Sequence, residues 1–243
     1  MEAVTYLGAD GSQWPLTARE HRGVFLREGA LSLVPGDDAE ADSRLSGSLQ
    51  LVVADNDPEG RGLASIDEAM RLWRRAWSRR LWGTLLVRGA PEAPRSWARV
   101  RLAAPVPDLT RVDPEGCEEF DLQVVGQSRR WLRTQTVVGP TAVVVNGGDR
   151  EVWPRVRWRS GGVLVLPSGA KVTLPTVGDW RTVHLDPWLG CEVVTDAGVR
   201  DDVLWRRLRG VVFPEVVPAG EQRMFRVPEG AQVSWDMEVE DPL

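Results

Sequence analysis

The feature that most constrains the fold is a regular alternation of short apolar runs and turn-forming residues. Glycine, proline, aspartate and asparagine recur at intervals of roughly ten residues, and short Val-, Leu- and Trp-rich runs lie between them. Strands joined by tight turns produce this spacing, whereas helices would need longer uninterrupted segments. The sequence therefore predicts an all-β, mainly antiparallel protein.

Individual strands are identified by side chains that alternate between apolar and polar along the chain. The clearest case is 232–240, in which the apolar residues are Val233, Trp235, Met237 and Val239. Alternation of this kind is typical of an antiparallel strand with one buried and one solvated face. The same pattern predicts strands at 83–88, 97–103 and 155–159.

One segment, 65–80 with the sequence SIDEAMRLWRRAWSRR, departs from the β pattern. Ser65 followed three residues later by Glu68 is a capping box, which opens a helix. Apolar residues, Trp73 and Trp77 among them, recur at helical spacing, and arginines occupy the other face. We expect a single amphipathic helix whose tryptophans pack against a sheet.

The arginine face of this helix has more than one interpretation. A basic amphipathic helix with aromatic residues can bind phosphates or a membrane surface. Because the tryptophans have core-type spacing, we favour a packed helix whose arginines contact a neighbouring subunit, since arginine suits ion pairs at interfaces. The acidic segment 35–48 would offer complementary charge. The candidate interface residues are Arg71, Arg74, Arg75 and Arg79.

The length of 243 residues suits one large domain or two of ordinary size. A boundary is expected at 138–140, between the stretch RRWLRTQTVVGP and the strand-like AVVVN. The predicted domains are 1–138 and 139–243. Cys117 and Cys191 stand far apart and without a CxxC pattern, so we expect reduced, buried thiols and neither a disulfide framework nor a zinc site.

Charge and hydropathy exclude several classes of partner. The net charge of -5 argues against a nucleic-acid binder, because affinity for phosphates needs clustered positive charge. No run of about 18 apolar residues occurs, and the first residues lack the basic and then apolar pattern of a signal peptide. We expect no membrane partner, no specific nucleic-acid binding, and a chain that stays in the cytosol where it is made.

Groups suited to catalysis are scarce. The chain has two histidines, His21 and His184, and no G-x-S-x-G nucleophile elbow. His184 and Asp186 would share one face of a strand, but no triad accompanies them, so an ordinary strand histidine is expected. Neither a GxxxxGK[ST] loop nor a GxGxxG turn is present to hold a nucleotide. The sequence predicts no enzyme, no catalytic residue and no cofactor.

Two acidic clusters carry groups that could bind a cation or react. The segment 54–62, ADNDPEGRG, imitates the start of a calcium loop, but its twelfth position would be Ile66, which cannot ligate a cation. Glu118, Glu119 and Asp121 could include a glycosidase pair, yet Glu118 and Glu119 would point to opposite faces of a strand. A solvated turn and a solvated sheet edge are the favoured interpretations, so no metal site is expected.

Several motifs follow one another in a fixed order. The run NGGDREVWPRVRW, which starts at Asn146, combines an N-x-G-D turn with a W-P strand. Ahead of it stand YLGADGSQWPL, the helix SIDEAMRLWRRAW, then GTLLVRG and WARVRLAAP. Behind it stand HLDPWLGCEVV and FPEVVPAGEQRMFRVPEGAQVSWDMEV. In this order the motifs resemble the distal tail proteins of siphoviruses over nearly the whole chain.

This resemblance implies a split-barrel-like N-terminal domain with one helix and a galectin-like β-sandwich as the C-terminal domain. It also implies a structural protein of the virion, at the tail tip, made in the cytoplasm of a bacterial host. Six copies would form a ring that joins the tail tube to the tail tip or baseplate. The implied partners are the tail tube protein, the tape-measure protein and tail-tip or hub proteins.

One alternative function stays open at this point. The chain contains twelve tryptophans, which a sugar-binding protein would expose and an assembly protein would bury in cores and interfaces. The alternative is a carbohydrate-binding module of the tail tip that contacts the host cell surface.

Overall fold

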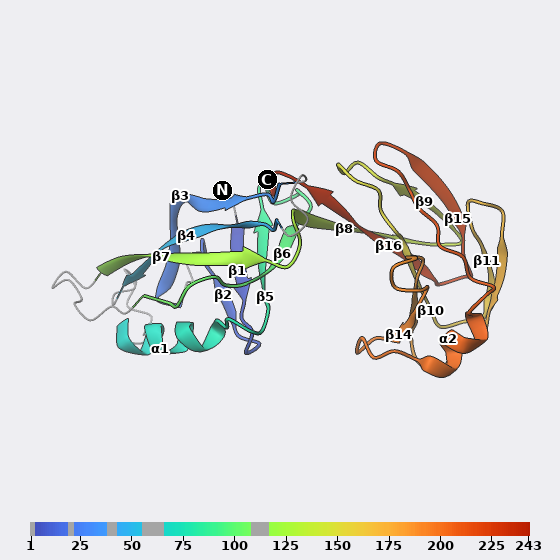
Figure 1. Cartoon of the computed structure of the whole chain (residues 1–243), viewed down its shortest axis with the longest axis horizontal. Helices are drawn as coiled ribbons and strands as arrows, with labels where there is room; N and C mark the ends of the chain where they lie inside the picture. Colours follow the sequence, from blue (N-terminus) through green and yellow to red (C-terminus); the bar gives the residue numbers. More distant parts are fainter. Residues whose placement is uncertain (1–2, 19–21, 38–42, 55–65, 108–116) are drawn as a thin grey trace. The chain divides into compact units, whose positions relative to one another are not determined.

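The computed structural model describes residues 3–18, 22–37, 43–54, 66–107 and 117–243. The chain divides into two compact units, and each has its own hydrophobic core (Figure 1). The first unit comprises Met1–Leu132 and Val239–Leu243, and the second comprises Arg133–Glu238. The fold is mainly antiparallel β, as the sequence predicts, but the described residues include two short helices where one was expected.

The named strands of the first unit hydrogen-bond in one continuous antiparallel order. They are β1 (Ala3–Leu7), β2 (Gln13–Pro15), β3 (Val24–Val34), β4 (Ser46–Ala54), β5 (Gly83–Arg88), β6 (Ser96–Leu102) and β7 (Cys117–Gly126). The order is β2-β1-β5-β6-β7-β4-β3. The strands predicted at 83–88 and 97–103 are confirmed as β5 and β6, since both alternate buried and less buried residues along their length.

Helix α1 (Ile66–Ala76) packs on this sheet through its aromatic residues. The Trp73 side chain is fully buried, and Trp14 of β2 meets its ring edge-on with 5.0 Å between centroids. The ring of Tyr6 in β1 stacks on Trp77, 3.8 Å away and inclined by 8°. The predicted packing of both tryptophans against the sheet is confirmed. Ser65 of the predicted capping box lies outside the described residues.

The helix ends four residues earlier than the predicted 65–80. The carbonyl oxygen of Ala76 accepts hydrogen bonds from the Ala9 N–H at 2.8 Å and from the Tyr6 hydroxyl at 3.0 Å. The Arg80 N–H, which would continue the helix, instead donates to Ser78 Oγ at 3.0 Å. Tertiary contacts with the β1–β2 hairpin thus terminate a segment whose apolar spacing alone would allow another turn.

The second unit has two sheets. Its elements are β8 (Trp131–Val138), β9 (Thr141–Val145), β10 (Arg155–Trp158), β11 (Gly162–Val165), β12 (Lys171–Leu174), β13 (Arg181–His184), β14 (Val193–Thr195), α2 (Asp202–Leu208), β15 (Gln222–Arg226) and β16 (Gln232–Val239). The strand orders are β14-β13-β10-β16-β8 and β12-β11-β15-β9. Both sheets contribute to one core, for example Trp158 and Trp235 from the first and Val144 and Phe225 from the second.

Strand β16 confirms the alternation read from the C-terminal sequence, because Val233 and Trp235 are buried. The compact units differ from the predicted domains 1–138 and 139–243 in two places. They separate after Leu132, inside β8, and the last five residues, Val239–Leu243, belong to the first unit. Whether 1–138 and 139–243 are independent folding domains stays a prediction.

Cys117 is exposed and Cys191 is half-buried, so the prediction of buried thiols was wrong, and neither cysteine forms a disulfide. Cys117 is the first residue of β7, and Cys191 lies just before β14. Among the described residues, no helix combines the length and hydropathy that crossing a bilayer requires.

Replacing Trp73 by alanine should reduce the free energy of unfolding by about 3 to 5 kcal/mol, because a large buried ring would be lost from the first core. Trp73→Phe should cost clearly less, since no hydrogen bond of the Trp73 indole N–H is found within the described residues. Chemical denaturation of the two variants measures both effects. Equal stability of Trp73→Ala and the parent chain would contradict the docked helix.

Candidate interaction surfaces

The first candidate surface is the arginine face of α1, defined here as Arg71, Arg74, Arg75 and Arg79. All four side chains are exposed; the first three lie on the helix, and Arg79 lies in the bend just after it. Arg71 approaches Glu68 at 3.8 Å, and Arg74 donates to the Pro107 carbonyl at 2.9 Å. Burial of the apolar side of α1 thus turns these guanidinium groups toward solvent.

Asp10, in the turn after β1, is charged at neutral pH near this face. Burial raises the pKa of the Asp10 carboxyl, but hydrogen bonds from the Ser12 side chain and backbone N–H and the charge of Arg75 outweigh burial. The net result is a pKa below the usual range. Asp10 is therefore a counterion at the edge of the arginine face, in addition to Glu68 beside Arg71.

The second candidate surface is the outer face of β4 and β7. Glu119 and Asp121 lie on this face, whereas Phe120 and Leu122 between and beside them point into the core. Glu118 points to the opposite face from Glu119, as the sequence predicts. Strand β7 pairs with β4 from Cys117 to Val125, whereas its pairing with β6 is limited to Val124, Val125 and Gly126. Among the described residues, Glu118, Glu119 and Asp121 have a paired strand on one side only, so they lie at a sheet edge, as the sequence predicts.

This outer face contains a shallow hollow of about 280 Å³. Its lining residues are Arg27, Gln50, Leu51, Glu119, Phe120 and Asp121. Gln50 and Asp121 are direct cross-strand neighbours, and Arg27 Nη1 lies 3.1 Å from Glu119 Oε2. Two carboxylates and an amide thus surround a small depression, which suits a cationic side chain better than an anionic one.

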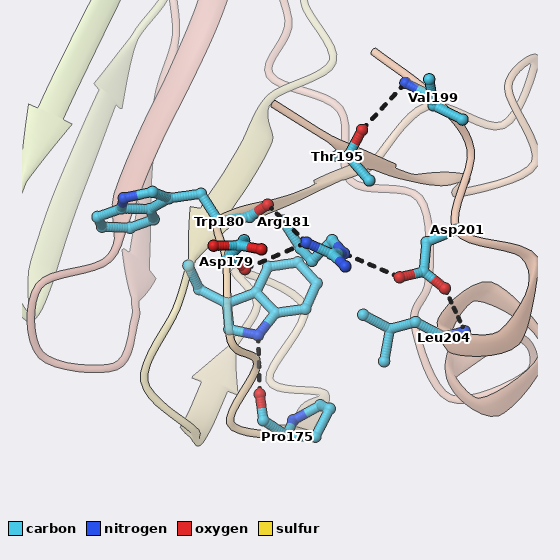
Figure 2. A network of polar contacts seen from close by, with 9 residues as sticks. Pro175, Asp179, Trp180, Arg181, Thr195, Val199, Asp201 and Leu204 are labelled. Atoms are coloured by element: carbon cyan, nitrogen blue, oxygen red, sulfur yellow. Dashed lines mark hydrogen bonds and ion pairs between the residues drawn. The ribbon is translucent and has the colours of Figure 1, made fainter. Parts of the chain in front are cut away.

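In the second unit, Asp201 anchors helix α2 (Figure 2). One carboxylate oxygen accepts the Leu204 N–H at 3.0 Å as an N-cap, and the other accepts Arg181 Nε at 2.8 Å. The Arg181 guanidinium also donates to the carbonyls of Asp179 and Trp180 at 3.3 and 3.1 Å. The hydrogen bonds from Arg181 and Leu204 hold the pKa of the Asp201 carboxyl below its usual range. This network ties α2 to β13.

The third candidate surface is the turn around Trp188, which α2 supports. The indole N–H of Trp205 on α2 donates to the Gly190 carbonyl at 3.1 Å. The Arg200 and Arg209 guanidinium groups lie 3.9 and 5.0 Å from the centre of the Trp205 ring. The Trp188 side chain itself is 87% exposed. A large aromatic residue is therefore presented to solvent on a braced turn.

The remaining residues singled out in the sequence do not form a reactive site in the described part of the chain. His184 lies on β13 opposite Arg155 of β10. Burial, and then the charge of Arg155, lower the pKa of His184, so its imidazole is neutral at pH 7. Within the described ranges, no three His, Cys, Asp or Glu residues gather as metal ligands do. His21 and most of the calcium-like segment 54–62 lie outside those ranges.

Helix α2 and its supports were missed in the sequence, although the signals were present. Asp201 and Asp202 supply an N-cap and an acidic first turn. Leu204 and Leu208 follow at the spacing of one buried helical face, and Arg206 with Arg207 makes the last turn basic. A seven-residue helix gives too few periods to stand out among short strands, which is why the β pattern dominated.

Comparison with known proteins identifies structural relatives only. No family model matches this chain, and no curated protein matches it in sequence. A chain of the phage p2 baseplate in its activated conformation with Ca is 10% identical, with 99% of each chain covered and a TM-score of 0.51; the Sr form of that baseplate gives the same values. The crystal structure of Dit from phage SPP1 is 13% identical over 98% of each chain, with a TM-score of 0.49.

The likeness to the p2 baseplate chain shows a shared fold over nearly the entire length of both proteins. The resemblance to phage tail components that the sequence motifs indicate is thereby confirmed at the level of the fold. At 10% identity the side chains of surfaces differ widely, so the contacts of the relative do not transfer to this chain residue by residue.

Asp201→Ala should destabilise the protein by about 1 to 2 kcal/mol at pH 7, because the helix cap and the bond to Arg181 are both lost. Asp201→Asn should cost less, since asparagine still caps a helix. The lowered pKa means that the carboxylate stabilises the fold above about pH 4 and loses this effect as pH falls through the folded pKa.

Denaturation at pH 7 and near pH 3 tests this account. The difference in the free energy of unfolding between the parent chain and Asp201→Asn should disappear in acid. Asp149→Asn, at an exposed position of the same unit, serves as the control and should show no such gap. A gap for Asp201→Asn that is the same at both pH values would contradict the assigned role.

Proposed function

We propose that this protein is a structural subunit of a phage or phage-derived tail, located at the tail tip as a distal tail or baseplate hub component. The observation that carries the proposal is the fold shared with a phage p2 baseplate chain over 99% of both proteins. The order of the sequence motifs gives independent support. A baseplate chain acts through its surfaces, so this role is not enzymatic.

The proposed architecture assigns a different task to each part of the chain. The N-terminal part, 1–138, would be a split-barrel-like domain that forms the ring, and 139–243 would be a galectin-like β-sandwich. Two sheets that share one core in the second unit support the sandwich. The continuous order of seven strands around the α1 core supports a separate N-terminal domain.

The ring would contain six copies, a number that rests on the family resemblance alone. Two structural features support assembly through the first unit. Strand β3, eleven residues long, ends the strand order, and a long end strand benefits from being covered by a neighbour. The arginine face of α1 is open to solvent and offers charge for a subunit contact. The tail tube protein, the tape-measure protein and tail-tip or hub proteins would be the partners of this ring.

Electron cryomicroscopy of the intact particle tests this function. We expect this chain to appear as a closed ring of six copies where the tail tube meets the tail tip. Labelling the chain with an antibody against the second unit provides the control for its identity in the image. A single copy per particle, or scattered copies along the tail, would show that the proposed hub role is wrong.

A second candidate function is carbohydrate binding at the tail tip, and the 87% exposed side chain of Trp188 is the observation that favours it. Aromatic rings in lectins stack on the apolar faces of sugars. A glycan array with the purified chain and with Trp188→Ala separates the two functions. Binding that disappears in Trp188→Ala, but persists in the exposed control Val203→Ala, would establish sugar binding; no binding by the parent chain would leave the structural role alone.

A further inference from the structure

We propose that the arginine face of α1 in one copy docks on the outer face of β4 and β7 in the next copy, with a guanidinium group in the hollow beside Glu119 and Asp121. The occupant of this hollow is therefore a second copy of the same chain. The inference rests on the proposed ring, because it names the two surfaces that make each contact between neighbours.

The two surfaces lie on opposite sides of the first unit. The residues of β4 that face α1, Leu49 and Leu51, share one core with Met70 and Trp73 of the helix. Gln50, between them, points the other way and lies on the outer face. A contact between opposite sides is head-to-tail, which is the geometry that generates rings.

The charges of the two surfaces are complementary. On the arginine face, Arg75 and Arg79 make no ion pair with any described residue. On the outer face, the Asp121 carboxylate is exposed and likewise lacks an ion pair in the described part of the chain. Apart from the charge of Asp10 near Arg75, each surface therefore presents charge that forms no ion pair among the described residues of its own copy. Arginine and carboxylate also match in shape, since two parallel N–H groups can meet two oxygens.

The hollow fits an arginine side chain in its polarity as well as its charge. Gln50, Glu119 and Asp121 supply hydrogen-bond acceptors around the hollow. Glu119 is engaged with Arg27, but these side chains are 62% and 58% exposed. Exposed pairs of this kind contribute little, so Glu119 can turn toward an incoming guanidinium at small cost.

Charge reversal in the full chain tests the contact by sedimentation velocity at about 50 mM salt, where surface charges are weakly screened. R75E/R79E and D121R should each weaken self-association by roughly tenfold or more. The combined variant R75E/R79E/D121R should recover it, because the charges are exchanged rather than removed. R206E/R207E alters two exposed arginines of α2 and is the matched control, which should associate like the parent chain.

Chemical cross-linking can detect the contact even if it is too weak to be seen by sedimentation. In a chain with both native cysteines replaced by serine, Arg75→Cys together with Asp121→Cys should give covalent multimers with a short bismaleimide at high protein concentration. Arg206→Cys with Asp121→Cys is the control pair. Multimers equal to those of the control, or reversals that leave association unchanged, would overturn the contact. Near-native circular dichroism of each variant ensures that misfolding is not the cause.

The two levels of the proposal fail in different ways. A ring in particle images, without specific cross-links from the Arg75 and Asp121 pair, would leave the hub function standing and overturn this contact. Specific cross-links and charge rescue, without a ring in the particle, would establish the contact and overturn the hub function.

Discussion

The packing of α1 through Trp73, together with Trp77 directly after the helix, is the interaction on which the first unit depends. Trp73 and Trp77 meet Trp14 and Tyr6, so four aromatic rings from the helix and the β1–β2 hairpin form the centre of one core. This packing fixes the rotation of the helix about its axis, and the rotation determines where the charged residues point. The arginines are therefore exposed as a direct consequence of burying the tryptophans.

The second unit uses a different physical device to hold its helix. A seven-residue helix buries only Leu204 and Leu208, which is little apolar surface for one element. Directional bonds make up the difference, because Asp201 joins the helix start to Arg181 and Trp205 joins its middle to the Gly190 carbonyl. Such bonds fix orientation better than hydrophobic contacts do, so the turn that carries Trp188 has a defined position.

The sequence predicted an element correctly where the spacing of its own apolar residues determines its secondary structure. Strands β5, β6 and β16 and helix α1 each carry a clean alternation, and the structure confirms them. The prediction from sequence failed where contacts with residues far away in the chain determine the structure. The end of α1 depends on Ala9 and Tyr6 bonding to the Ala76 carbonyl. The arginine face was found because amphipathic spacing is local, whereas its proposed counterpart on β7 required knowing that β4 lies beside it.

The proposed contact between copies makes sense energetically only as a repeated one. A single exposed ion pair is worth about 0 to 1 kcal/mol, far less than two proteins need to associate. Closing a ring changes this balance, since each copy makes the contact on both sides and the last contact forms within a single assembly. Charged surfaces then act mainly by orienting neighbours and excluding wrong arrangements, while burial of strand edges such as β3 would supply the affinity. Each charge pair between copies is weak, so the chain is suited to stay monomeric in dilute solution. Because the charges on its opposite sides are complementary, copies that are held close together can still assemble in one arrangement.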